Sequence, residues 1–252
     1  MKKINGKTNR VALLDELRGL SILLMVAYHA AYDLHYLFNR PVAALHWPLV
    51  KLLQPLFAGV FIIISGMACR FSRNNLKRGL ITLALGGVMT LATLVLALDQ
   101  PIYFGILHLL GSCMLLYGLL HRALDALRPL PAAAILLVLF ALTYYIPAGL
   151  VGLPPFSLLL PIPLTTTNWG LALGFCRPDF SSPDYYPLLP WAFLFFAGAY
   201  LGLPVREGRA PACIYTPHWG WLAAVGRHTL LIYLLHQPVV YSLLWLWFRL
   251  VK

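Results

Sequence analysis

The chain has 252 residues, of which 60% are hydrophobic and 11% are charged, and its mean hydropathy is +0.77. An ordinary soluble domain carries about 25% charged residues, so this composition predicts a membrane protein. The formal net charge of +11 does not predict nucleic-acid binding, because the Lys and Arg residues stand between apolar runs and do not cluster on a soluble face. Apolar runs and short connectors use nearly all of the length, so we expect a single integral-membrane domain over residues 1–252.

Seven apolar runs are long enough to cross a bilayer, which takes about 20 helical residues. They are residues 18–38, 50–69, 79–98, 102–120, 130–148, 188–204 and 228–248. The first run follows a basic start, as the apolar part of a signal peptide does, but its apolar character continues to Phe38 and predicts a retained helix. The sequence therefore predicts an all-α, polytopic transmembrane helix bundle of about seven spans.

An eighth span is possible within residues 149–187, which are apolar but contain Pro154, Pro155, Pro161 and Pro163. Proline interrupts helices, and irregular backbone at membrane depth is stable only against protein or water. We favour an outer or re-entrant segment over an eighth span.

The distribution of basic residues predicts a cytoplasmic N-terminus in a bacterial-type inner membrane. This orientation places inside Lys2, Lys3, Lys7, Arg10, Arg18, Arg70, Arg73, Lys77, Arg78, Arg122, Arg128, Arg206, Arg209 and Arg227. It leaves outside only Arg40, Lys51, Arg177, Arg249 and Lys252. The cysteines show no metal-type pairing such as CxxC, so neither a metal site nor a disulfide framework is predicted.

The first run carries ionisable residues, which inside a membrane suggest a functional site. Arg18 and His29 are 11 positions apart, or about 16 Å along a helix, which puts Arg18 at the cytoplasmic surface and His29 near the midplane. Asp33 shares a helix face with His29 and is placed to orient its imidazole or to stabilise its protonated form.

Two further histidines are predicted at a similar depth. His108 lies about 10 Å below the outer edge marked by Pro101, and His236 lies about 14 Å above the inner edge marked by Arg227. Each of them taken alone is more often an ordinary interhelical hydrogen-bonding group, and that alternative stays open because their directions around the helices are not fixed by the sequence.

The flanking loops hold the remaining candidates. Arg73, Lys77 and Arg78 suit the phosphates of a cytoplasmic nucleotide-like donor, although an inside loop of this charge is expected in any case. His46 and Trp47 lie in the first outer loop, where Trp47 alone would be an interfacial anchor. At the second outer entrance, the rings of Tyr185, Tyr186 and Trp191 are typical of an aromatic belt, and together with Asp184 they also suit a sugar acceptor.

Four segments, "LRGLSILLMVAYHAAYDL", "FGILHLLG", "DYYPLLPWAFLFFAGAYLG" and "GRHTLLIYLLHQP", resemble bacterial membrane proteins related to the catalytic domain of heparan-alpha-glucosaminide N-acetyltransferase. The spacing of Arg18 and His29 is also similar to the Arg-x10-His feature of the wider transmembrane acyltransferase group. The resemblance implies acetyl-CoA as a cytoplasmic co-substrate and a glycan or sugar acceptor outside. In the lysosomal relatives the proposed active histidine lies in the loop after the first helix, where His46 is the nearest candidate, so the choice between His29 and His46 stays open.

These observations lead to the hypothesis of a membrane acetyltransferase. His29, Asp33 and His46 are the catalytic candidates; Arg18, Arg73, Lys77 and Arg78 would bind the donor; and His108, Asp184, Tyr185 and His236 would bind the acceptor. The main alternative is a proton-coupled transporter in which His29, Asp33, His108 and His236 form a relay. A non-catalytic subunit of an envelope-modifying complex is a third possibility, and no oligomeric state is predicted.

Overall fold

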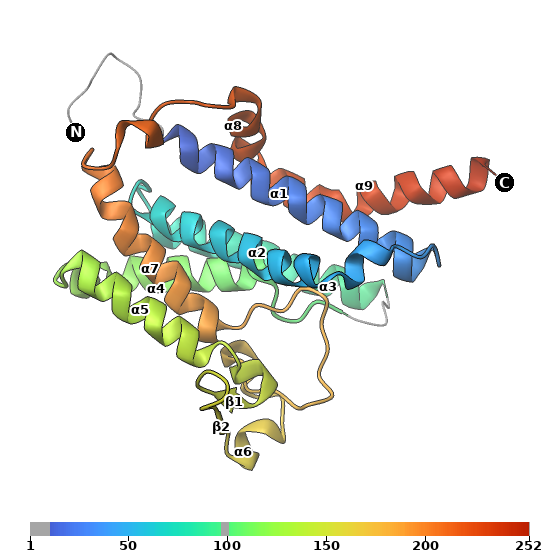
Figure 1. Ribbon diagram of the computed structural model, residues 1–252, viewed down its shortest axis with the longest axis horizontal. Helices are drawn as coiled ribbons and strands as arrows, with labels where there is room; N and C mark the ends of the chain where they lie inside the picture. Colours follow the sequence, from blue (N-terminus) through green and yellow to red (C-terminus); the bar gives the residue numbers. More distant parts are fainter. Residues whose placement is uncertain (1–10, 97–100, 252) are drawn as a thin grey trace. The chain divides into compact units, whose positions relative to one another are not determined.

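The computed structural model describes residues 11–96 and 101–251, and it confirms the predicted all-α class (Figure 1). The long helices are α1 (Ala12–Tyr32), α2 (Pro48–Cys69), α3 (Asn75–Val95), α4 (Ile106–Asp125), α5 (Pro129–Thr143), α7 (Leu188–Arg206) and α9 (Thr229–Leu250). Shorter elements are a π-helix η1 (Asp33–Leu37), the 3-10 helices η2 (Ala43–His46), η3 (Ile146–Ala148), η4 (Leu171–Leu173) and η5 (Ala212–Ile214), strands β1 (Leu150–Val151) and β2 (Leu158–Leu159), and helices α6 (Ile162–Thr165) and α8 (Gly220–Arg227).

Among the described residues, six helices are long and apolar enough to cross a membrane. They are Pro48–Cys69, Asn75–Val95, Ile106–Asp125, Pro129–Ala148, Leu188–Arg206 and Thr229–Leu250. The first predicted run forms α1, but this helix begins at Ala12 and so adds Asp15 and Glu16 to Arg18, and these three charges make it more charged than the six. That α1 also crosses the membrane stays a prediction.

Some sequence predictions fall outside the described residues. They are the basic residues Lys2, Lys3, Lys7, Arg10 and Lys252, and the end of the third apolar run at residues 97 and 98.

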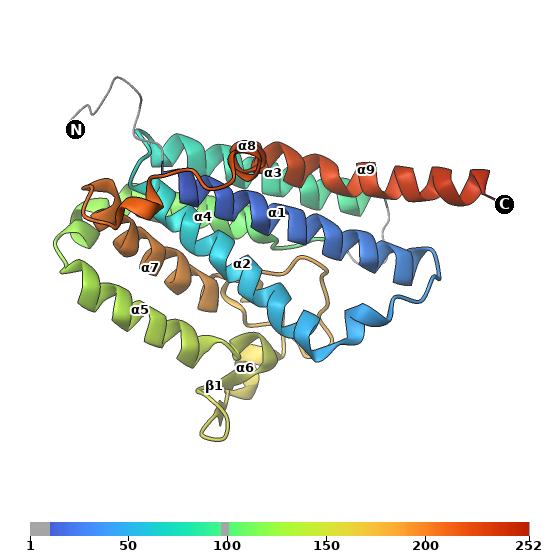
Figure 2. The same cartoon turned by 45° about the horizontal axis from the view of Figure 1, so that its top comes forward.

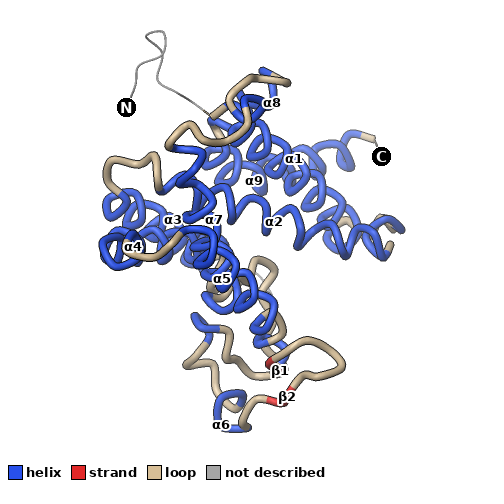
Figure 3. Tube along the Cα trace, turned by 60° about the vertical axis from the view of Figure 1, so that its left-hand side comes forward, coloured by secondary structure: helices blue, strands red, loops and turns tan. Residues whose placement is uncertain are grey.

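The proline-containing segment 149–187 has no helix of spanning length, in agreement with the preference for an outer or re-entrant segment. Its strands β1 and β2 pair antiparallel, with Leu150 opposite Leu159, and loops join the short helix α6 and the 3-10 helix η4 (Figure 3).

The contacts divide the chain into two compact units, Met1–Phe61 with Gly208–Lys252, and Ile62–Glu207. In the first unit α1 packs against α8 and α9 (Figure 1). Glycines allow α1 and α8 to approach closely, because a Cβ at Gly19 would meet the carbonyl of Leu222 and one at Gly226 would meet the carbonyl of Asp15. Contacts of this kind are typical of helix pairs in membranes.

In the second unit α3 packs against α4 and α5 packs against α7 (Figure 2). The part of α2 that belongs to this unit meets α7 through another glycine pair, since a Cβ at Gly66 would meet the carbonyl of Phe195 and one at Gly198 would meet that of Ile63. Phe195 and Leu109 are fully buried. Large apolar side chains on the outer faces, such as Leu91 and Val95 of α3, are exposed in the chain itself, as expected of surfaces that face lipid.

Candidate active site

Two histidines from distant parts of the chain meet within the first unit. The rings of His29 on α1 and His236 on α9 have centroids 5.0 Å apart and planes inclined at 64°. The depths predicted from the sequence therefore correspond to a direct contact for this pair. The third histidine, His108, belongs to the second unit.

Backbone carbonyls fix the tautomer of both rings. His29 Nδ1 lies 2.9 Å from the carbonyl oxygen of Met25, and His236 Nδ1 lies 2.6 Å from that of Tyr233. A carbonyl oxygen only accepts, so each Nδ1 carries the proton and donates it, and each neutral ring keeps a lone pair at Nε2. His236 Nε2 is buried and has no hydrogen-bond partner among the described residues. A buried acceptor of this kind is suited to a ligand hydroxyl or amine.

Asp33 lies one helical turn beyond His29, but its direct partner is on α9. Gln237 Nε2 donates to both carboxylate oxygens of Asp33 at 2.9 Å, and Asp33 is 1% exposed. The sequence predicts that Asp33 orients the ring of His29 or stabilises its protonated form. In the structure the carbonyl of Met25 holds that ring, and Asp33 ties the end of α1 to the residue next to His236. A role of Asp33 with protonated His29 stays a prediction. Sequence reasoning missed Gln237, although its position in "LHQP" directly after His236 was available as an indication.

Arg18 is partly buried near the beginning of α1. Its Nη1 lies 3.2 Å from Asp15 Oδ1, one turn earlier on the same helix. Along the helix axis Arg18 is about 16 Å from His29, as the sequence predicts. Any anion bound at Arg18 therefore shares the guanidinium with Asp15.

His46, the alternative catalytic candidate, belongs to a second histidine pair. Its Nε2 lies 3.4 Å from His35 Nε2, and His35 Nδ1 accepts a hydrogen bond of 3.1 Å from the backbone N–H of Val42. Because His35 accepts at Nδ1, its neutral ring carries the proton at Nε2 and donates it to His46. Sequence reasoning missed His35, which follows Asp33 by two positions and so lies off the helix face that His29 and Asp33 share.

The acceptor-binding candidates His108 and Asp184 both lie at the beginning of α4. Asp184 Oδ2 accepts a hydrogen bond of 3.2 Å from the backbone N–H of Ile106. The ring of His108 stacks on Phe104 at 5.4 Å between centroids, and Gly86 of α3 lies against the same ring. The Nδ1 atom of His108 is buried and has no hydrogen-bond partner among the described residues.

The hydroxyl of Tyr185 is engaged within the outer segment. It donates to the carbonyl oxygen of Leu171 at 2.8 Å and lies 3.9 Å from Cys176 Sγ, and the ring packs against Phe180. Burial raises the pKa of this phenol and that of the Cys176 thiol. Tyr185 therefore holds the loop in place, and its role with an acceptor stays a prediction.

The donor-binding candidates of the second loop separate in the structure. Arg73 lines a cavity at the end of α2, whereas Lys77 and Arg78 lie in the first turn of α3 and are not part of its wall. The helix begins with the side chain of Asn74 accepting from the backbone N–H of Lys77 at 2.8 Å. In the described part of the chain, no group of three or more His, Cys, Asp or Glu side chains is placed to hold a metal ion.

Apolar helices of spanning length and a histidine pair between two helices define a polytopic membrane protein with a partly buried imidazole site. The chain matches the family described as heparan-alpha-glucosaminide N-acetyltransferase, catalytic, over residues 10–238, and it belongs to that family. The resemblance seen in the sequence is thereby confirmed. No curated protein and no solved structure matches the chain. Membership supports an enzyme of the transmembrane acetyltransferase class.

Proposed function

We propose that the protein transfers an acetyl group from cytoplasmic acetyl-CoA to a hydroxyl or amino group of a glycan or sugar on the other side of a bacterial-type inner membrane. The observation that carries this proposal is the His29–His236 pair, with Nδ1 of both rings held by backbone carbonyls and with both Nε2 lone pairs left for a ligand. Family membership supplies the class of reaction.

The pair suits general base catalysis of acyl transfer. His29 Nε2 removes the proton of the acceptor group, whose oxygen or nitrogen then forms a bond to the thioester carbonyl carbon. The carbon–sulfur bond breaks, and the CoA thiolate leaves and takes up the proton from His29. A histidine base in such a step contributes about 10² to 10⁴ in rate.

The neighbouring residues support this step. The Met25 carbonyl keeps its hydrogen bond to Nδ1–H of His29 while that ring is protonated, and the carboxylate of Asp33 stabilises the positive charge. His236 Nε2 accepts a hydrogen bond from the acceptor and so positions it.

We assign the donor and acceptor contacts to the remaining candidates. Arg18 binds a phosphate of acetyl-CoA, and the pantetheine arm covers the distance of about 16 Å from Arg18 to His29. The basic loop residues Arg73, Lys77 and Arg78 are further candidates for donor phosphates. His46 in the first unit, and His108, Asp184 and Tyr185 in the second, are the candidates for contacts with the acceptor.

The test uses purified protein in proteoliposomes with radiolabelled acetyl-CoA and a panel of amino sugars and glycans. His29→Gln should lower turnover by about 10² or more with little change in CoA affinity, because the imidazole acts in the transition state. His228→Gln is the matched control, since His228 is exposed at the end of α8. Equal turnover in the parent, in His29→Gln and in His228→Gln would refute the catalytic role of His29.

The transporter alternative is tested in the same vesicles without acetyl-CoA. Proton-linked flux of a solute under these conditions, together with no acetyl transfer to any acceptor, would contradict the proposed enzyme and favour the relay of His29, Asp33, His108 and His236.

A further inference from the structure

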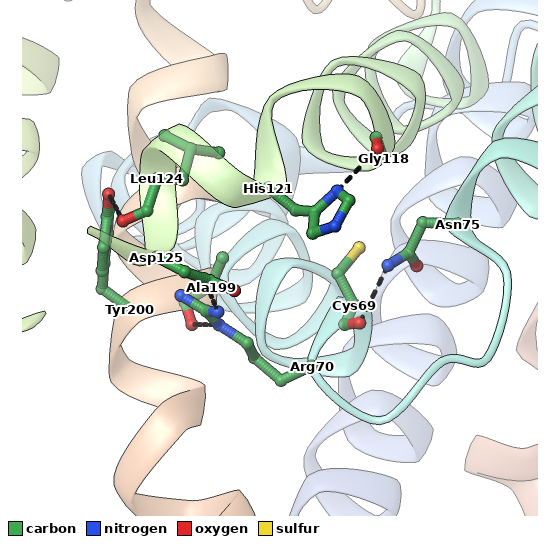
Figure 4. A network of polar contacts seen from close by, with 9 residues as sticks. All are labelled: Cys69, Arg70, Asn75, Gly118, His121, Leu124, Asp125, Ala199 and Tyr200. Atoms are coloured by element: carbon green, nitrogen blue, oxygen red, sulfur yellow. Dashed lines mark hydrogen bonds and ion pairs between the residues drawn. The ribbon is translucent and has the colours of Figure 1, made fainter. Parts of the chain in front are cut away.

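A buried arginine lies at the end of α2 in the second unit, where Ile62–Glu207 form one compact body. The Arg70 side chain is 2% exposed. Its Nε donates to the carbonyl oxygen of Ala199 at 2.7 Å, and its Nη1 pairs with Asp125 (Figure 4). The guanidinium also lies over the rings of Tyr117 and Tyr200, at 5.3 and 5.7 Å from their centroids. Arg70 is therefore held rigidly between α2, α4 and α7.

A cavity of about 300 Å³ opens beside this arginine. Its wall comes from the ends of four helices, namely the end of α2, the beginning of α3, the last turns of α4 and the end of α7, and from the loop that joins α2 to α3. This volume is at the lower end of the range of small-molecule sites, about 300–1,000 Å³, and exceeds what a single ion needs.

The charges around the cavity favour an anion. Asp125 neutralises Arg70, and it is the only carboxylate in the wall as the structure describes it. Arg73 and Arg206 also line the cavity, and neither has an ion-pair partner within residues 11–96 and 101–251. Two guanidinium groups without a counter-ion remain, and guanidinium groups bind phosphate oxygens through paired hydrogen bonds.

Polar atoms in the same wall also lack partners. Ser72 Oγ and Asn75 Oδ1 are buried and make no hydrogen bond with any described residue. Asn75 Nδ2 donates to the carbonyl oxygen of Cys69 at 3.0 Å, which fixes the amide and leaves Oδ1 as an acceptor (Figure 4). The Ser72 hydroxyl is free to donate to a phosphate oxygen, and Asn75 Oδ1 to accept from a protonated group beside it. The N-terminal end of α3 adds partial positive charge to this region.

We propose that this pocket binds a phosphate group, with Arg73, Arg206 and Ser72 as its ligands and with Arg70 as the rigid floor. Phosphate esters occur both in the nucleotide part of coenzyme A and in the headgroups of anionic phospholipids. Phosphate binding follows from the pocket itself, whereas assignment of the phosphate to the acyl donor rests on the proposed function.

The experiment measures calorimetric binding of pyrophosphate and of coenzyme A to the full chain in nanodiscs of neutral phosphatidylcholine. The Arg73→Gln/Arg206→Gln variant should bind at least one of these two probes roughly tenfold or more weakly than the parent does. If the pocket instead holds a lipid headgroup, the variant should keep roughly tenfold less anionic phospholipid bound after purification. Arg122→Gln is the matched control, because Arg122 carries the same charge at the end of α4 but does not line the cavity. It should change each affinity by less than about twofold.

The source of the phosphate is found by repeating the titrations in nanodiscs that contain phosphatidylglycerol. For a donor site, coenzyme A binds equally well in both lipids and pyrophosphate competes with it. For a lipid site, phosphatidylglycerol weakens the binding of both soluble probes. The double variant then retains less phosphatidylglycerol after purification than the parent does.

Two results separate this inference from the proposed function. His29→Gln should bind pyrophosphate as tightly as the parent does. Loss of acetyl transfer in this variant together with unchanged pyrophosphate binding would therefore support the phosphate pocket. If the double variant has the parent's thermal stability and binds pyrophosphate, coenzyme A and phosphatidylglycerol as tightly as the parent, the phosphate pocket is wrong.

Discussion

At the scale of single residues, the state of His46 depends on His35. The Nε2–H of His35 donates to His46 Nε2, so this lone pair is occupied as long as His35 is present. His35→Phe should expose the lone pair of His46 Nε2 and so increase the rate at which diethyl pyrocarbonate modifies His46. We expect an increase of about fivefold, because the lost hydrogen bond contributes about 1 kcal/mol. Mass spectrometry reports the rate at each histidine, and exposed His228 serves as the internal reference. An unchanged rate at His46 would rule out the hydrogen bond.

A second residue-scale prediction concerns the buried carboxylate of Asp33. Gln237→Leu removes both of its hydrogen bonds from Gln237, and it should destabilise the protein by about 1.5–3 kcal/mol, since hydrogen bonds to charged groups are in this range. Thermal unfolding in detergent measures the loss. Asp33→Asn combined with Gln237→Leu should be less destabilised than the sum of the single variants, because the charge that needs the amide is gone. Strict additivity would show that the two residues are not coupled.

The sequence predicted part of this site because the helical rise fixes depth. His29 and His236 were placed at a similar level by counting residues from the ends of their runs, and the structure shows them in contact. Rotation about the helix axis is not fixed by counting. Gln237 and His35 were therefore missed, and Arg70 was recognised only as an inside charge, since its burial depends on residues more than fifty positions away.

At the scale of helices, the close approach of α2 and α7 depends on glycine. A Cβ at position 198 would meet the carbonyl of Ile63, so Gly198→Ala should push the helices apart and cost about 1–3 kcal/mol. Gly87→Ala in α3 is the matched control, because no atom outside the neighbouring backbone of its own helix lies within 4 Å of the added Cβ, and alanine favours helix by about 1 kcal/mol. Unfolding temperatures should fall for the first variant and stay level or rise for the second. A tolerated Gly198→Ala would contradict the close packing.

The helices themselves were largely predictable, whereas their ends were less so. Residues 188–204 were expected to span and α7 is Leu188–Arg206, because apolarity and helix coincide there. α1 begins six residues before its predicted run, since its first turns include the charged residues Asp15 and Glu16 and a search for apolarity does not include them. The strands β1 and β2 were not predicted, because two-residue strands have no detectable periodicity.

At the scale of the whole molecule, the distribution of basic residues predicts which side each loop faces. Three helices, α2, α3 and α4, separate Ala43 from Ala126, so cysteines at these positions should label from opposite sides of the membrane. The parent for this test is Cys213→Ser, because Cys213 is exposed and the other three cysteines are buried. A membrane-impermeant maleimide added to intact cells should label Ala43→Cys and should label Ala126→Cys only after lysis. The reverse labelling pattern would show that the predicted orientation is wrong and that the proposed donor residue Arg18 faces the outside.

The two imidazoles are each locked to their own helix, His29 through Met25 of α1 and His236 through Tyr233 of α9. Neither of these two hydrogen bonds joins α1 to α9. Sliding or tilting of α9 against α1 would therefore change the distance between the two Nε2 lone pairs without moving a proton from either Nδ1. The hydrogen bonds from Gln237 of α9 to Asp33 do cross between the two helices, so such a motion would have to break them. When the helices return, each ring still has its proton on Nδ1 and its lone pair on Nε2, because both hydrogen bonds lie within a single helix.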